Sequence, residues 1–103
     1  MRQSIANHRT EPVWACPFMD DLARFDLDFH SVIFDRRSGY THILDPVAGF
    51  VLALVAESGH TRSDILDQTA QGLECDEAVD LSAHVDRALD QLRALDLVVM
   101  NDP

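Results

Sequence analysis

The segment from Ser31 to Leu54 constrains the fold most, because it combines a tight β-hairpin with a helix that is apolar on nearly all sides. Two runs rich in β-branched and aromatic residues, 31–34 and 40–44, are separated by the polar turn formers of 35–39. Gly39 can take the positive φ that a bulged hairpin loop often needs. We therefore expect the two runs to pair as antiparallel strands.

Asp45 and Pro46 indicate where the hairpin gives way to a helix. The Asp carboxylate can accept from unpaired backbone N–H groups, and Pro needs no donor at the first helical position. We expect this helix to run from Pro46 to Glu57 and to form the centre of the core, because it is apolar nearly all round. Gly59 is expected to end it in a left-handed conformation.

Two further helices are predicted downstream. Thr61 to Asp64 resembles a capping box and begins a short helix over about 62–72. In the last helix, His84 and Leu89 lie beside a one-sided apolar stripe and widen it, which leaves room for a groove at the helix edge. The stripe recurs at steps of four, three, four and three residues: Leu81, Val85, Ala88, Leu92 and Leu95.

A strand is expected within 21–29, upstream of the hairpin. Phe25, Leu27 and Phe29 alternate there with Asp26 and Asp28, which gives one apolar and one acidic face. This alternation is typical of a half-buried strand.

The composition fits one small globular domain, with 103 residues of which 47% are hydrophobic. We divide the chain into a partly flexible extension, 1–20, and one domain, 21–100. No apolar run is long enough to span a membrane or to act as a signal peptide, so a cytoplasmic location is expected. Cys16 and Cys75 are isolated and are expected to be reduced thiols.

The charge balance argues against nucleic acid as a partner. The chain has eight arginines, no lysine and 18 acidic residues, for a formal net charge of −10. Such a charge opposes binding to a phosphate backbone. Arg36 and Arg37 are the one local basic candidate, and beside Asp35 they are expected to form a solvated turn.

No catalytic constellation stands out. The five histidines lack metal-binding spacing, and the four glycines fall in separate elements. The carboxylates include no pair in an apolar setting that would mark a general acid. We therefore expect no enzyme activity, no metal site and no cofactor.

Several segments together resemble the PqqD-like peptide chaperones. The hairpin ends in GYTHILD (39–45), a buried helix follows, and Gly59 and Thr61 precede a second helix that contains Ile65. The final helix reads LxxLxxLxLV over 89–98. The resemblance covers 22–98, and its most specific part, THILDPVAGFVL, is similar to the subgroup whose genes accompany an HPr-kinase-like protein.

This resemblance implies an α+β, winged-helix-like fold in which a three-stranded antiparallel sheet is followed by three helices. It also implies a non-catalytic adaptor, a RiPP recognition element, which binds the leader of a precursor peptide. The leader would add a strand to the hairpin edge and rest against the last helix, and the rest of the peptide would be presented to a modifying enzyme. An exposed strand edge and side-chain pockets suit that role.

Ten positions carry the implied peptide site. The leader edge consists of Tyr40, Thr41, His42, Ile43 and Leu44. The facing groove consists of His84, Val85, Ala88, Leu89 and Leu92.

Two positions depart from the family pattern, and the extension is not explained by it. Asp45 stands where the family often has Asn, and Asp96 where a Gly commonly ends the last helix, but both are capping-type residues. The extension could cover the edge strand or mediate a homodimer. The alternatives to the adaptor are a winged-helix DNA-binding regulator and a small self-associating interaction protein.

Overall fold

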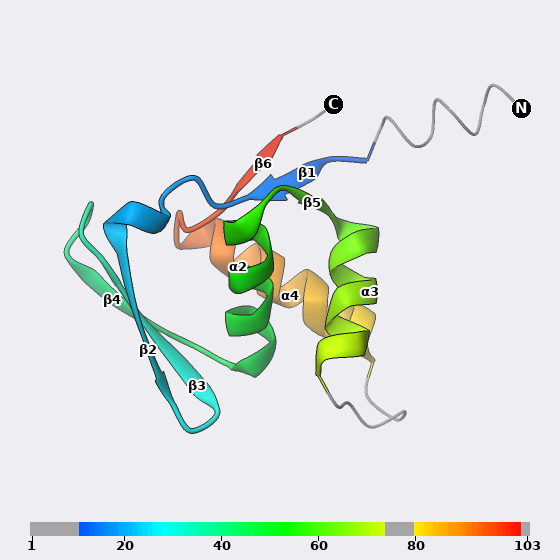
Figure 1. Ribbon diagram of the computed structural model, residues 1–103, viewed down its shortest axis with the longest axis horizontal. Coiled ribbons are helices and arrows are strands. Elements are labelled where there is room, and N and C mark those ends of the chain that lie inside the picture. The colour runs from blue at the N-terminus through cyan, green and yellow to red at the C-terminus, as the bar shows by residue number, and fades with distance from the viewer. Residues whose placement is uncertain (1–10, 74–79, 102–103) are drawn as a thin grey trace, which may run out of the picture.

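A computed structural model describes residues 11–73 and 80–101, which form two small sheets around three helices (Figure 1). The elements in chain order are β1 (Val13–Ala15), a short 3-10 helix η1 (Met19–Asp21), β2 (Leu22–Leu27), β3 (His30–Asp35), β4 (Tyr40–Leu44), α2 (Pro46–Glu57), β5 (His60–Thr61), α3 (Arg62–Gly72), α4 (Leu81–Ala94) and β6 (Val99–Asn101). This α+β, winged-helix-like architecture confirms the expected fold class.

The predicted hairpin is present as β3 and β4, and the predicted upstream strand is present as β2. The three strands form one antiparallel sheet in the order β2–β3–β4, so β3 is central and the other two are edges. In the hairpin, Ile33 lies opposite His42. Gly39 adopts φ +80° and its N–H donates to the Asp35 carbonyl oxygen at 2.7 Å, as a tight loop requires.

The three predicted helices are confirmed. Asp45 caps α2 by accepting from the Ala48 N–H at 2.8 Å, and Thr61 caps α3 by accepting from the Asp64 N–H at 3.2 Å. The expected left-handed Gly59 is wrong, because Gly39 is the glycine with positive φ among the described residues. Gly59 is instead required by a close approach: a Cβ there would lie 2.6 Å from a Val13 side-chain carbon.

The second sheet, β5–β1–β6, was not predicted. β1 lies at its centre and pairs antiparallel with both neighbours, so that Trp14 lies opposite His60 on one side and Met100 on the other. Trp14 and Cys16 are buried in the same core as the helices. The described part of the N-terminal extension therefore packs onto the domain, while residues 1–10 lie outside the described residues.

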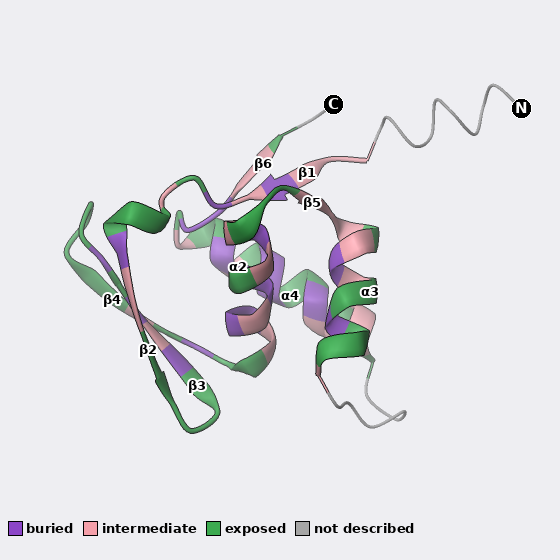
Figure 2. Cartoon of the chain, viewed as in Figure 1, coloured by how far each residue is buried: buried purple, intermediate pink, exposed green. Residues whose placement is uncertain are grey.

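The core forms where α2 and α4 pack together between the two sheets (Figure 2). α2 buries residues on several sides, as expected for its nearly all-apolar sequence. The stripe of α4 is also buried at Val85, Ala88 and Leu92. Cys16 is a buried free thiol, and burial raises its pKa; Cys75 lies outside the described residues.

The β2–β3–β4 sheet turns polar side chains toward the helices. Arg24 donates to the Gly49 carbonyl of α2 at 3.0 Å and to the Ser31 hydroxyl at 2.9 Å, and it pairs with Asp26 at 3.1 Å. Ser31 in turn donates to Asp26 at 2.8 Å, which lowers the Asp26 pKa together with Arg24. This network fastens the sheet to the first turns of α2.

The sequence pattern of β2 predicted that its apolar face would be covered and its acidic face exposed, and this prediction is wrong. Because Arg24 reaches the helix, alternation sends Phe25 and Leu27 to the opposite side, where they are 61% and 60% exposed. Phe29, in the turn, is 79% exposed.

Replacing Gly49 with Ala tests the close contact between the sheet and α2. The added Cβ would lie 2.6 Å from the Ser31 hydroxyl oxygen, so we expect a loss of about 1–3 kcal/mol of unfolding free energy. Helix propensity alone predicts the opposite sign, a gain of about 1 kcal/mol. Chemical denaturation measures the difference.

Ser31→Ala provides the control for this prediction. The double variant Ser31→Ala/Gly49→Ala should lose less stability than the two single losses added, because the clashing hydroxyl is gone. A Gly49→Ala protein more stable than the wild type would contradict the contact.

Candidate functional site

The candidate site begins at the free edge of β4. Among the described residues β4 pairs with β3 alone, so its other edge has unpaired N–H and C=O groups. Side chains alternate along it: Leu44 is buried, His42 is half-buried and Tyr40 is exposed on the side of the helices. Thr41 and Ile43 are exposed on the opposite side.

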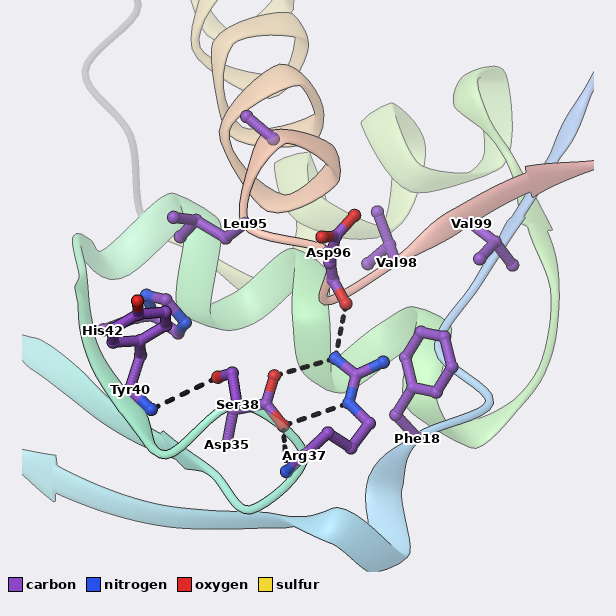
Figure 3. Close-up of a pocket in the computed structure, with 11 residues that line it drawn as sticks. Phe18, Asp35, Arg37, Ser38, Tyr40, His42, Leu95, Asp96, Val98 and Val99 are labelled. Atoms are coloured by element: carbon purple, nitrogen blue, oxygen red, sulfur yellow. Dashed lines mark hydrogen bonds and ion pairs between the residues drawn. The ribbon is translucent and has the colours of Figure 1, made fainter.

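A pocket of about 530 Å³ lies beside this edge, between the hairpin and the end of α4 (Figure 3). One wall comes from the β3–β4 loop and β4, and the other from the C-terminal end of α4 and the chain that follows it. Phe18 closes one end. The wall residues are Asp35, Arg37, Ser38, Tyr40 and His42 on one side and Ala94, Leu95, Asp96, Val98 and Val99 on the other.

Arg37 holds the two walls together. Its guanidinium makes a two-point contact with the buried Asp35 carboxylate, from Nε at 3.0 Å and from Nη2 at 2.8 Å. The same Nη2 donates to the Asp96 carbonyl oxygen at 2.5 Å. The guanidinium also lies over the Phe18 ring, 3.7 Å from its centroid. One side chain thus links the hairpin loop, the N-terminal segment and the turn after α4.

The electrostatics of this cluster favour the ion pair. Hydrogen bonds from Arg37 hold the pKa of Asp35 below its ordinary value, although burial acts in the opposite direction. Asp35 raises the pKa of Arg37 correspondingly. The Asp35 carboxylate is therefore charged and neutralised within the pocket wall.

Asp96 shapes the other wall through its backbone. It takes φ +59° at the end of α4, with its N–H donating to the Arg93 carbonyl and the Leu97 N–H donating to the Leu92 carbonyl. This is a Schellman-type ending, in which Gly is the usual residue. Asp96 thus takes the left-handed conformation that Gly usually adopts at a helix end, and its carbonyl is turned toward Arg37.

The predicted helix groove is mostly filled by the core. Val85, Ala88, Leu89 and Leu92 are at most 3% exposed, and His84 is half-buried. The pocket lies farther along, where Ala94 and Leu95 contribute its wall. Of the five predicted edge residues, Tyr40 and His42 line the pocket, and Leu44 belongs to the core.

The expected solvated turn is present, because Arg36 and Arg37 lie exposed in the turn between β3 and β4, but both side chains also have protein partners. Arg37 is occupied by Asp35, Phe18 and Asp96, and Arg36 donates to the Asp20 carbonyl at 3.0 Å. Because both guanidinium groups have protein partners, the hairpin tip is poorly suited to bind phosphates.

Phe18, Leu95 and Val98 were not predicted as site residues. The sequence could have indicated Leu95 as a site residue, because Leu95 ends the apolar stripe of α4 one turn beyond Leu92. No sequence pattern indicated Phe18 as a site residue, since its position beside Arg37 depends on how the N-terminal segment packs.

Within residues 11–73 and 80–101, no cluster of three or more His, Cys, Asp or Glu side chains could hold a metal ion. None of the helices described here has the length and apolar character needed to cross a membrane.

Comparisons with known proteins place the chain in a family. Residues 30–98 match the family model described as coenzyme PQQ synthesis protein D (PqqD). The chain therefore belongs to the PqqD family. A search of curated proteins gives no match.

One solved structure, TbiB1 in complex with the TbiA(beta) leader peptide, has a similar fold. It matches with a TM-score of 0.57 and 19% sequence identity, over 77% of this chain and 90% of that one. At this identity the likeness shows a shared fold.

The buried ion pair predicts a specific pH dependence of stability. Because folding lowers the Asp35 pKa, the pair stabilises the protein above the unfolded-state pKa, near pH 4, and the stabilisation is lost as the pH falls through the lower folded-state pKa. Asp35→Asn should lose about 3 kcal/mol at neutral pH, measured by chemical denaturation.

The same variant should lose less stability than the wild type between pH 5 and pH 3. Asp67→Asn, at an exposed position on α3, is the matched control and should follow the wild-type curve. Parallel pH curves for Asp35→Asn and the wild type would contradict the account.

Proposed function

We propose that this chain is a peptide-binding adaptor that captures an extended leader segment by strand addition at the free edge of β4. The observation that carries the proposal is that this edge borders the 530 Å³ pocket directly, through Tyr40 and His42. A strand added there would satisfy the unpaired backbone groups of β4.

Alternation along the added strand explains how the pocket contributes selectivity. Side chains on one face of the leader strand would point toward the end of α4, and those on the other face would point away from it. Leu95, Val98 and the ring of Tyr40 offer apolar contact, while the adjacent Asp35 carboxylate is already neutralised by Arg37. The site therefore favours an apolar side chain at the inward positions.

Charge favours a basic leader. The chain carries a formal net charge of −10, which would accelerate encounter with a positively charged peptide. Such complementarity influences association rate and partner choice more than affinity.

The adaptor would act with a modifying enzyme, to which it would present the rest of the precursor peptide. Membership of the PqqD family and the fold shared with a leader-peptide complex support this role. The similarity of 41–52 to the subgroup accompanied by an HPr-kinase-like protein makes such a protein a candidate partner.

Leu95→Ala tests the helix side of the pocket. Removing this side chain should weaken binding of a synthetic leader, taken from the precursor encoded beside this gene, by about tenfold. Leu66→Ala on α3 is the matched control, since Leu66 is also partly buried against the core but lies outside the pocket. Isothermal titration calorimetry measures both affinities, and equal losses in the two variants would contradict the pocket's role.

Amide chemical shifts separate the adaptor from a winged-helix DNA-binding regulator. In a titration with the same peptide, we expect shifts along 40–44 and around 94–98, because the added strand contacts both walls. Duplex DNA at moderate salt should leave these signals unchanged. Shifts caused by DNA, with none caused by the peptide, would favour the regulator.

A further inference from the structure

The side of the β2–β3–β4 sheet that faces away from the helices is apolar and exposed. Phe25, Leu27 and Ile43 are 60–66% exposed there, and Phe34 is 37% exposed. Phe25, Val32 and Ile43 lie opposite one another in register, so they form a row across all three strands. We call this surface the outer face, made of 23, 25, 27, 30, 32, 34, 41 and 43.

The outer face differs from the solvent side of an ordinary half-covered antiparallel sheet, because it is apolar although Leu22, Ile33 and Leu44 already bury an apolar inner face. Such sheets place apolar residues against the core and polar residues in water. Here Arg24 and Asp35 point inward and are engaged in the contacts with α2 and Arg37. No Asp, Glu or Arg occupies the outer-face positions, although the chain carries a formal net charge of −10.

We infer that the outer face is a docking surface for a second copy of this chain, packed sheet against sheet about a two-fold axis. In a two-fold contact the same patch serves both partners, so a surface that is apolar and carries no acidic or arginine side chain can pack against its own copy without charge repulsion. The absence of acidic side chains matters, because two such acidic chains repel wherever their carboxylates meet.

The area available is sufficient for a weak dimer. A large apolar side chain has about 150–250 Å² of surface, so Phe25, Leu27, Phe34 and Ile43 with the adjacent Phe29 offer roughly 500 Å² per copy at exposed fractions of 37–79%. Two copies together bury about 1,000 Å², which is near the lower bound for a specific interface. We therefore expect reversible association rather than an obligate dimer.

This arrangement leaves the peptide site open. The pocket lies on the helix side of the sheet, and face-to-face packing occupies neither β2 nor β4 along its edge. The dimer would offer two leader sites, and it does not depend on the proposed peptide binding.

Phe25→Asp tests the inference, because Phe25 is exposed and lies on β2, the strand at the opposite edge from β4. Sedimentation equilibrium of the wild-type chain should show a monomer–dimer equilibrium that tightens with added salt, as charge repulsion is screened. The variant loses two Phe side chains from each dimer, so its dissociation constant should rise about 100-fold or more. Met19→Asp, at another exposed apolar residue outside the outer face, should dimerise like the wild type.

Phe25→Ala introduces no charge, so it tests the loss of the apolar contact alone. It should also weaken the dimer. An unchanged circular dichroism spectrum would show that the variant remains folded. A wild-type chain that remains monomeric up to high micromolar concentration would overturn the inference, as would equal weakening by Met19→Asp and Phe25→Asp. Leader binding, measured on the same Phe25→Asp protein, should persist, so failure of the dimer and failure of the peptide site are distinguishable.

Discussion

The contact between Arg37 and the buried Asp35 carboxylate is the interaction on which the candidate site depends. Two hydrogen bonds, at 3.0 and 2.8 Å, fix the guanidinium at the base of the β3–β4 loop, and its remaining contacts reach the Phe18 ring and the Asp96 carbonyl. The hairpin is thereby held at the end of α4 with a pocket between them. A buried ion pair adds little net stability compared with apolar packing, but leaving one partner unpaired is costly, so such a pair favours one arrangement.

Arg24 determines which face of the β2–β3–β4 sheet lies against the helices. By donating to the Gly49 carbonyl and to Ser31, it turns the face of β2 that carries Leu22 and Asp26 toward the helices and leaves Phe25 and Leu27 on the outside. The sheet consequently presents two different surfaces to partners. Its β4 edge offers backbone groups beside a pocket, which suits an extended peptide, and its outer face offers an uncharged apolar area, which suits a second sheet.

The helices and the β3–β4 hairpin were predictable because residues within or next to each element specify it. Asp45 and Thr61 cap the helices they precede, and the hairpin follows from its two β-branched runs and the glycine in its loop. The second sheet was not predictable, since β1 and β5 are very short and are stabilised by distant partners. Alternation along β2 correctly separated two faces but could not say which one meets the core, because that choice depends on Arg24 reaching α2. The edge strand of the site was predicted, whereas the pocket wall at Leu95 lies one turn beyond the expected groove.

The central claim is that a leader peptide adds a strand to the free edge of β4. Isotope-edited NMR of a labelled leader bound to the protein tests it most directly, because paired strands bring backbone protons of neighbouring chains into close contact. The account predicts cross-strand nuclear Overhauser effects between the peptide backbone and the amides of 40–44, with slowed hydrogen exchange at alternate residues of β4. Tight binding without such contacts, or with contacts along the β2 edge instead, would contradict it.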